Sequence, residues 1–169
     1  MAFEEGSEVL ELERASGSGA DLTAVRIRRS DGEARRLPCR RAVLACGAWA
    51  ASGGVGTFSA VNADSYDADG NPIPQVYHGA TRQERHQELI RYAIDGAVTQ
   101  VKKAYDIAAG RGAININVLW EMGGAQAVLE GVLENTRGMV TGVTCGAGMP
   151  YKLAEIAARC NVCYLPIVS

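Results

Sequence analysis

Residues 139–168, MVTGVTCGAGMPYKLAEIAARCNVCYLPIV, contain the pattern that decides the fold class. An apolar run over 139–145 ends in a glycine-rich turn, a helix is predicted over 151–159, and a second apolar run follows over 162–168. Two apolar strands joined by a helix form a parallel pair with a crossover connection. This stretch therefore predicts one β-α-β unit.

The same alternation extends back to residue 56. Further strands are predicted over 56–60 and 113–119, and further helices over 82–109 and 124–135. Both a doubly wound sheet and a (β/α) barrel satisfy this pattern, and periodicity does not choose between them. The sequence predicts an α/β fold with a parallel sheet.

The long helix predicted over 82–109 has a start signal and a stop signal in the sequence. Thr81 with Glu84 three residues later forms a capping box, and Gly110 is a stop signal. Its apolar residues recur at three- and four-residue spacing, which predicts one buried face, formed by Ile90, Ala93, Ala97, Val101, Ala104 and Ala108.

The first fifty residues have a different pattern. Short alternating runs over 8–13 and 23–28 flank a turn-rich segment, and residues 30–33 lead into a third run. This pattern is typical of a small antiparallel meander. The continuous apolar run over 41–47 is interpreted as a buried strand. We expect two parts, a meander over 1–50 and a parallel α/β part over 51–169.

Composition favours an ordinary globular protein, with 47% apolar and 21% charged residues. Lysine plus arginine is 17 and aspartate plus glutamate is 19, so the formal charge is 17 − 19 = −2. A near-neutral chain without a basic stripe gives no reason to expect nucleic acid or a membrane as partner. The acidic N-terminus resembles no secretion signal, and a cytoplasmic location is expected.

Cysteines and histidines offer no catalytic arrangement. The five cysteines are interpreted as buried thiols of a reducing compartment: Cys39, Cys46, Cys145, Cys160 and Cys163. The last two match C-x-x-C, but the first of them ends a helix, where the dipole opposes a thiolate. No second pair completes a zinc site. His78 and His86 are expected to be solvated.

Two further segments, residues 53–57 and 61–80, resemble known ligand-binding loops only in part. The stretch Gly53-Gly-Val-Gly-Thr57 is interpreted mainly as a tight backbone approach, because it lacks the spacing of a dinucleotide fingerprint. The acidic residues 64–69 fail the calcium-loop spacing and are assigned to turns. The connection over 61–80 is long enough to serve as a lid or rim. No metal site is predicted.

Thr144-Cys-Gly-Ala-Gly-Met-Pro150 is the most informative loop. It follows a strand, its glycines permit a close approach of the backbone, and Pro150 suits the first turn of a helix. Ligands of parallel α/β folds gather at the carboxyl ends of strands. The loop is therefore a candidate to meet a phosphate or a flavin ring oxygen.

Three stretches together resemble the nitronate monooxygenase family: 53–59 (GGVGTFS), 112–119 (GAININVL) and 143–169 (VTCGAGMPYKLAEIAARCNVCYLPIVS). The resemblance covers about 115 residues in the expected order. It implies a (β/α)₈ TIM-type barrel that binds FMN at the carboxyl ends of its strands and oxidises alkyl nitronates with oxygen. The cofactor-binding residues it implies are Gly53, Gly54, Asn117, Cys145, Gly146, Ala147 and Gly148.

The chain also departs from that family. Residues 1–50 resemble the β-rich part of FAD-dependent oxidoreductases, without the FAD-binding fingerprint. The resemblance further implies that the catalytic histidine and the flavin-phosphate glycines lie beyond the strand that ends at Ser169. No catalytic residue is therefore assigned. Four strands cannot close a barrel that typically needs about 250 residues. We expect a fragment, a fused reading frame, or a subunit completed by a partner.

The sequence thus supports two hypotheses. The first is an FMN-dependent oxidoreductase, acting on an alkyl nitronate or a related small molecule, with weak or no turnover by the chain alone. The second is a non-catalytic composite that self-associates as a homo-oligomer through an open sheet, because a half-barrel would expose strand edges and one apolar face.

Overall fold

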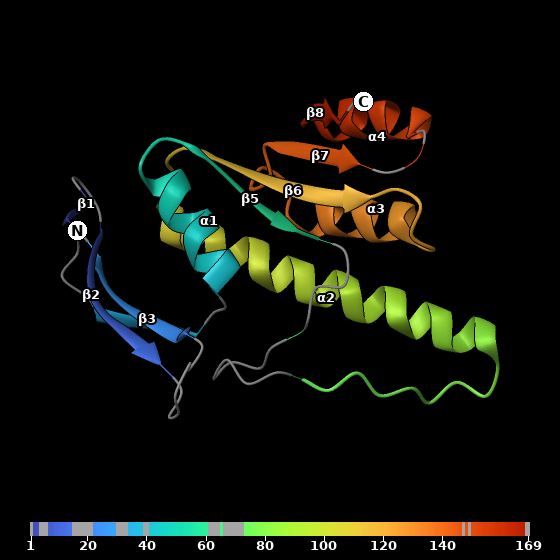
Figure 1. The fold of residues 1–169 in the computed structure, drawn as a ribbon, viewed down its shortest axis with the longest axis horizontal. Helices are drawn as coiled ribbons and strands as arrows, with labels where there is room; N and C mark the ends of the chain where they lie inside the picture. Colours follow the sequence, from blue (N-terminus) through green and yellow to red (C-terminus); the bar gives the residue numbers. More distant parts are fainter. Residues whose placement is uncertain are drawn as a thin grey trace.

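The computed structural model of the chain contains two four-stranded sheets (Figure 1). The first is antiparallel, with the order β1-β2-β3-β4, and the second is parallel, with the order β5-β6-β7-β8. The structure describes residues 2–3, 7–14, 22–29, 34–38, 41–60, 65, 73–146, 148 and 150–167. The protein is therefore α/β in its larger part, as the alternation of apolar runs predicts.

The antiparallel sheet confirms the predicted meander. Its strands are β1 (Ala2–Phe3), β2 (Ser7–Arg14), β3 (Leu22–Arg29) and β4 (Ala34–Pro38). Each strand pairs with the next along the chain. The alternation of apolar and polar residues in short runs, with turn residues between them, is sufficient to specify this arrangement.

The predicted strand over 41–47 is wrong. Residues Arg41–Ala51 form helix α1. A short continuous apolar run cannot be distinguished by periodicity from one turn of a buried helix. This run is rich in alanine, the strongest helix former, and it buries Cys46 and Ala50. Gly47 lets α1 approach closely, since a β-carbon there would lie 2.7 Å from Cβ of Ile107.

The predicted strands and helices after residue 53 are confirmed with small shifts in their ends. The strands are β5 (Val55–Ser59), β6 (Ala113–Leu119), β7 (Gly142–Gly146) and β8 (Cys163–Pro166), and the helices are α2 (Arg82–Ala108), α3 (Ala125–Asn135) and α4 (Tyr151–Cys160). The largest shift is at β7, which begins at Gly142 instead of Met139. The Met139 N–H donates to the Thr136 carbonyl, so this residue still belongs to the turn after α3.

The strand order is compatible with part of a (β/α) fold. The four parallel strands follow one another in chain order. A doubly wound sheet reverses its order at a switch point, and the described strands contain no such reversal. Helix α1 packs on α2, α2 on α3, and α3 on α4. The four helices therefore form one continuous layer beside the sheet.

Helix α2 begins as predicted. The Glu84 N–H donates to Thr81 Oγ1 at 3.1 Å, and the Thr81 N–H donates to Glu84 Oε2 at 2.8 Å. Its end differs slightly from the expectation, because Ala109 already adopts a left-handed conformation with φ 52°, followed by Gly110 with φ 74°. The predicted apolar stripe is buried from Ala93 onward.

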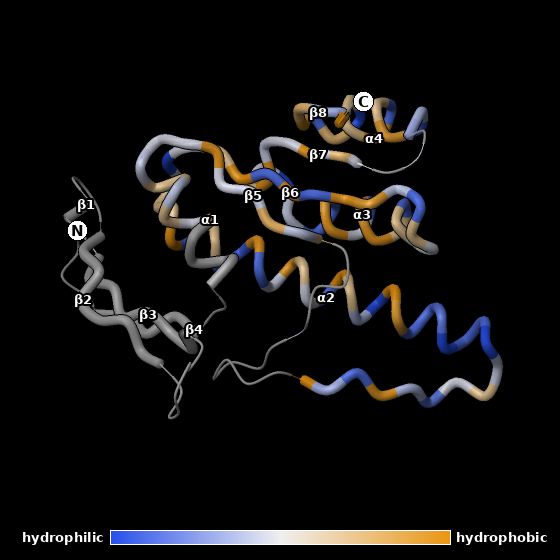
Figure 2. The backbone as a smooth tube through the Cα atoms, viewed as in Figure 1, coloured by the Kyte–Doolittle hydropathy of each residue, from blue (hydrophilic) through white to orange (hydrophobic). Residues whose placement is uncertain are grey.

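The two faces of the parallel sheet differ in chemistry. Alternate residues of a strand point to opposite faces, and the helix-facing side of β6 buries Ile114, Ile116 and Val118. The hydropathy of Figure 2 alternates along β6 accordingly. Fully burying such a side chain contributes about 1.5–3 kcal/mol. This face and the helix layer form one core.

The opposite face carries no described helix. Its exposed positions on β5 are Val55, Thr57 and Ser59, and its positions on β6 include Asn115 and Asn117. This face is polar in the middle of β5 and β6, and exposed apolar residues lie at the strand ends and on β8: Val55, Leu119 and Leu165. The alternation over residues 114–118 gives β6 one apolar and one polar face, which a fully buried parallel strand does not show.

Candidate functional site

Gly53 and Gly54 lie at the amino end of the parallel sheet, before β5. Gly53 is left-handed, with φ 89°. A β-carbon at Gly54 would lie 2.5 Å from Nε1 of Trp49, and a β-carbon at Gly56 would collide with the Cys46 carbonyl. The interpretation of this stretch as a tight backbone approach is confirmed. The structure does not bring Gly53 and Gly54 together with the other predicted cofactor-binding residues, which lie at the carboxyl end.

Asn117 lies at the carboxyl end of β6 on the helix-free face. It is in register with Ser59 of β5 on one side and with Thr144 of β7 on the other. The Oδ1 atom of Asn117 is buried and has no hydrogen-bond partner. A buried acceptor without a partner costs about 1–3 kcal/mol. The row Ser59-Asn117-Thr144 is therefore a place where a ligand with N–H or O–H groups gains by binding.

The neighbouring row, two residues toward the amino end of β6, is enclosed by protein groups. Asn115 is buried, and its Oδ1 lies 3.5 Å from Thr141 Oγ1, which also donates to the Ile114 carbonyl at 3.0 Å. Gly142 lies beside it, and a β-carbon there would collide with Oδ1 of Asn115. One asparagine of the AININ segment is therefore held by its neighbours, whereas the other is not. The acceptor without a partner, Asn117 Oδ1, is therefore the one at the end of the strand.

Ser59 and Thr144 did not emerge from the sequence as site residues. The signal that finds them is the period-2 alternation of small polar residues in each strand. Thr57 with Ser59 and Asn115 with Asn117 each follow this spacing. The register between strands, which depends on tertiary pairing, is what aligns Ser59 and Thr144 with Asn117.

The loop after β7 contains the remaining predicted residues. Gly146 ends the strand, and its carbonyl accepts from the Trp120 N–H at 3.3 Å. Gly148 is exposed and left-handed, with φ 86°. Ala147 lies outside the described residues. Gly146 and Gly148 are thus found at the same end of the sheet as Asn117, as predicted for a loop that follows a parallel strand.

Cys145 points to the other side of the sheet from Thr144 and Gly146, because neighbours in a strand alternate. Its side chain is buried. Burial raises the pKa of the Cys145 thiol, and a hydrogen bond from the Trp120 backbone opposes this shift. The thiol is therefore neutral and lies on the helix-facing side, away from the row that contains Asn117.

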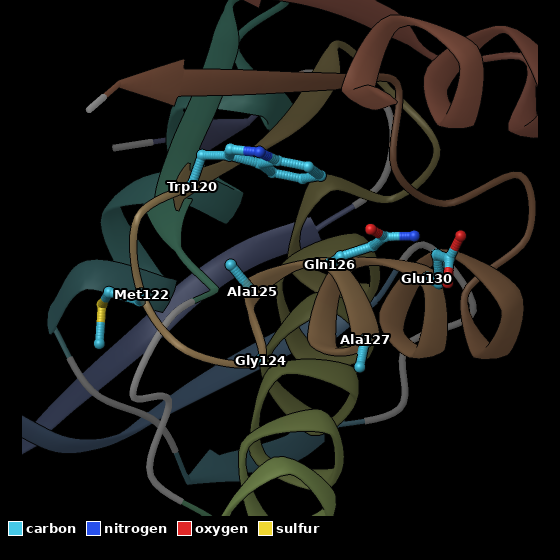
Figure 3. Close-up of a pocket in the computed structure, with 7 residues that line it drawn as sticks. All are labelled: Trp120, Met122, Gly124, Ala125, Gln126, Ala127 and Glu130. Carbon is cyan, nitrogen blue, oxygen red and sulfur yellow. The ribbon is translucent and has the colours of Figure 1, made fainter. Parts of the chain in front are cut away.

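Two pockets flank the strand ends. One of about 450 Å³ lies at the start of α3 and is lined by Trp120, Met122, Gly124, Ala125, Gln126, Ala127 and Glu130. In Figure 3, Gln126 and Glu130 lie on the face of α3 toward the Trp120 ring, whereas Ala127 points away from it. The other, of about 350 Å³, is lined by Cys145, Gly148, Pro150, Tyr151, Ala154, Tyr164, Pro166 and Ile167. Asn117 lines neither pocket.

The expectation of uniformly buried cysteines is wrong. Cys46 and Cys145 are buried, Cys160 is half-buried and Cys163 is exposed, and these four thiols are free. Burial raises the pKa of Cys46 to about 11. Cys163 is exposed because β8 is an edge strand, paired only with β7 among the described strands. Cys39 lies outside the described residues.

The two histidines are exposed, as predicted. The backbone N–H of His78 donates to Glu88 Oε2 at 3.0 Å, and that of Gly79 donates to the same oxygen at 3.2 Å. The segment before α2 is thus attached to the helix. His86 approaches the turn after β6, since a β-carbon at Gly123 would lie 3.5 Å from its Cε1. Most of the predicted lid, residues 61–64 and 66–72, lies outside the described part.

Within the described residues, no helix has both the length and the hydropathy needed to cross a membrane. In the same residues, no three side chains of His, Cys, Asp or Glu form a group that would hold a metal ion. The carboxyl end of the sheet offers the Asn117 amide, small residues, aromatic rings beside the two pockets, and the Glu121 carboxylate next to Gly148. In comparisons with known proteins, no family model matches the chain, and neither a curated protein nor a solved structure matches it.

Proposed function

We propose that the carboxyl end of the parallel sheet binds the ring of FMN, and that the protein is a flavin-dependent oxidoreductase of the nitronate monooxygenase type with a (β/α)-barrel architecture. The observation that carries the proposal is the unpartnered, buried Oδ1 of Asn117 at a strand end. A flavin ring presents one N–H donor and two carbonyl acceptors along one edge. An asparagine amide, which has both an acceptor and donors, is complementary to such an edge.

The residues around Asn117 support the same assignment. Ser59 and Thr144 add hydroxyl groups in the same row. Gly146 has no side chain of its own, so a planar ligand can approach the backbone at the end of β7. Sequential parallel strands with one layer of helices are compatible with part of a (β/α) barrel, whose ligands bind at this end of the strands.

The residues around Asn117 suit the ring of FMN and not its phosphate group. Gly53 and Gly54 lie at the opposite end of the sheet, so they have no part in the proposed site. When bound, flavin supplies two-electron chemistry, accepting electrons from a carbanion-like substrate and passing them to oxygen. The part of this chain is to orient the ring through Asn117 and to hold its polar edge in hydrogen bonds.

Flavin binding to the purified chain tests the proposal. We expect FMN fluorescence to be quenched on titration with the protein, and Asn117→Ala to weaken binding about tenfold, the loss expected for one well-placed hydrogen bond. Asn135→Ala is the matched control, because Asn135 is exposed at the end of α3 and only its own helix accepts from it. Its affinity should equal that of the wild type.

Two further results complete this test. Oxygen consumption with a simple alkyl nitronate would assign the reaction class once FMN is bound. A chain that binds neither FMN nor riboflavin, although well folded by circular dichroism, would contradict the proposal. Equal binding by wild type and Asn117→Ala would remove Asn117 from the site.

A second candidate function is self-association. Among the described strands, β5 and β8 each pair on one side only. Edge strands present unpaired backbone groups, and exposed apolar residues accompany both edges here: Val55, Leu165 and Ile167. A mass that rises with concentration in light scattering, and returns to that of the monomer in Leu165→Lys, would support it. A monomer at every concentration would contradict it.

A further inference from the structure

Two exposed leucine side chains adjoin the Asn117 row on the helix-free face. Leu119 follows Asn117 by two residues on β6, so both side chains point to this face. Leu165 on β8 is in register with Thr144, which is itself in register with Asn117. The two leucines are 41% and 43% exposed. A polar row and two accessible apolar side chains therefore share one surface at the carboxyl end of the sheet.

A third apolar side chain lies beside the end of β7. Gly146 pairs with Leu119 of β6. On the β8 side, a β-carbon at Gly146 would lie 3.2 Å from Cδ1 of Ile167, which is 65% exposed. The end of β7 thus has an apolar side chain on each side of it. Hydrocarbon placed over this strand end would contact both.

The four parallel strands present no charged side chain on this face. The positions that point to it are alternate residues of each strand, beginning at Val55, Ala113, Gly142 and Cys163. None of these positions is Asp, Glu, Lys, Arg or His, although 21% of the chain is charged. Covering a charged group with hydrocarbon costs far more than covering an apolar one. An alkyl chain can therefore lie on this face without removing an ion from water.

The spacing of the strands favours a single alkyl chain over a polypeptide as the occupant. Neighbouring strands lie about 4.8 Å apart, so β6 and β8 are roughly 10 Å apart. A hydrocarbon chain between them can lie about 3.5–4.0 Å from side chains on both strands, whereas a helix is about 10–12 Å wide. The unpartnered Oδ1 of Asn117 adds a polar anchor at the edge of the same surface.

We propose that Leu119 and Leu165 are specificity-determining residues, which bind the alkyl chain of the substrate beside the ring that Asn117 orients. The substrate is then an alkyl compound whose chain spans the roughly 10 Å from β6 to β8, instead of one with two or three carbons. This inference rests on the proposed function, because it names the substrate class of the same site.

Binding of n-alkanamides to the full chain tests the alkyl site without flavin. The carboxamide stands in for the ring edge at Asn117, and the hydrocarbon stands in for the substrate chain. Propanamide, hexanamide and octanamide are titrated into the ¹⁵N-labelled chain while the Leu119 and Leu165 amide resonances are followed. We expect the dissociation constant to fall about twofold for each added methylene group, about half the free energy of complete burial, because the surface is open on one side.

Leu119→Thr and Leu165→Thr each replace an exposed leucine with a residue that favours strands, so the variants should keep the dispersed spectrum of the wild type. In either variant, the preference for hexanamide over propanamide should fall from about eightfold to about threefold or less. Val55→Thr is the matched control, because Val55 is 52% exposed on the same face at the amino end. It should keep the preference of the wild type.

Three results would overturn the alkyl site. The first is equal dissociation constants for the three amides, and the second is the absence of saturable binding by any of them. The third is a preference for longer chains that survives in both leucine variants or is lost in Val55→Thr.

The outcomes also separate the alkyl site from the flavin assignment. If FMN does not bind, while a preference for longer chains is present and depends on the two leucines, the flavin assignment fails and the alkyl site stands. If FMN binds through Asn117, while the three amides bind equally, the flavin assignment stands and the alkyl site fails.

Discussion

The two ends of the parallel sheet use glycine for opposite purposes. At the amino end, the space that a side chain would take is already filled by backbone: a β-carbon at Gly56 would collide with the Cys46 carbonyl, and one at Gly112 with the Ala50 carbonyl. At the carboxyl end, Gly146 would meet only the side chain of Ile167, and Gly148 only that of Glu121. The first pair permits packing, whereas the second pair leaves room beside a loop.

The hydrogen bonding of the two ends differs in the same way. Near the amino end, Asn115 is engaged by Thr141. Near the carboxyl end, Asn117 Oδ1 lacks a partner. Gly56 and Gly112 at the amino end are therefore enclosed by backbone, whereas the carboxyl end has glycines beside side chains and an asparagine oxygen without a partner. A motif of glycines is informative about ligand binding only when it is known which end of a strand it occupies.

The largest loss of stability is expected for a substitution that disrupts packing at the amino end of the sheet. Gly56→Ala should lower the free energy of unfolding by about 3 kcal/mol, because the added methyl group meets backbone that cannot move aside without displacing α1. Gly146→Ala is the matched change at the carboxyl end and should cost less than about 1 kcal/mol, because its nearest neighbour is an exposed side chain 3.2 Å away. Urea unfolding of both variants measures the difference, and similar losses would contradict the comparison.

A smaller effect is expected at the loop after β7. Gly148→Ala forces an L-residue into the left-handed region, with φ 86°, which costs about 1–2 kcal/mol. The added methyl group would also displace the Glu121 side chain. We therefore expect a modest loss of stability together with weaker FMN binding. Unchanged binding would separate Gly148 from the proposed site.

The start of α2 should show a loss of about 1 kcal/mol. Thr81→Ala removes the side-chain acceptor of the Glu84 N–H, and loss of such a cap typically has this size. The two capping hydrogen bonds join Thr81 to Glu84 and involve none of the residues around Asn117. Flavin affinity should be unaffected, so thermal unfolding and flavin titration together separate stability from binding. Reduced flavin affinity would instead extend the site to the start of α2.

The smallest effect is a dependence on pH. Hydrogen bonds from the Thr81 backbone and side chain, opposed weakly by desolvation, hold the pKa of Glu84 below its usual value. A lowered folded-state pKa contributes stability above the unfolded pKa of about 4.3, and this contribution is lost as the pH falls through the folded value. The wild type should therefore lose slightly more stability than Glu84→Gln between neutral and acidic pH. Parallel curves would contradict this.

Much of the fold could be predicted from the sequence, because the governing interactions are local. The capping box of α2 and the apolar stripe that follows it involve residues three or four positions apart. The strands of the β-α-β units were placed within a few residues. The error at α1 arose because an apolar run of seven residues has the same hydrophobicity in a buried strand and in a buried helix, and only packing on α2 and β5 decides between them.

The features of the candidate site likewise fall into those set by local sequence and those set by tertiary structure. The sequence by itself determined that Asn117, Gly146 and Gly148 stand at strand ends, since a strand followed by a turn is a local pattern. Only the tertiary structure decided that Gly53 and Gly54 lie at the far end, that Ser59 and Thr144 flank Asn117, and that Glu121 covers Gly148. Each of these depends on the register between strands, which is set by pairing residues dozens of positions apart and by the burial of one face of the sheet.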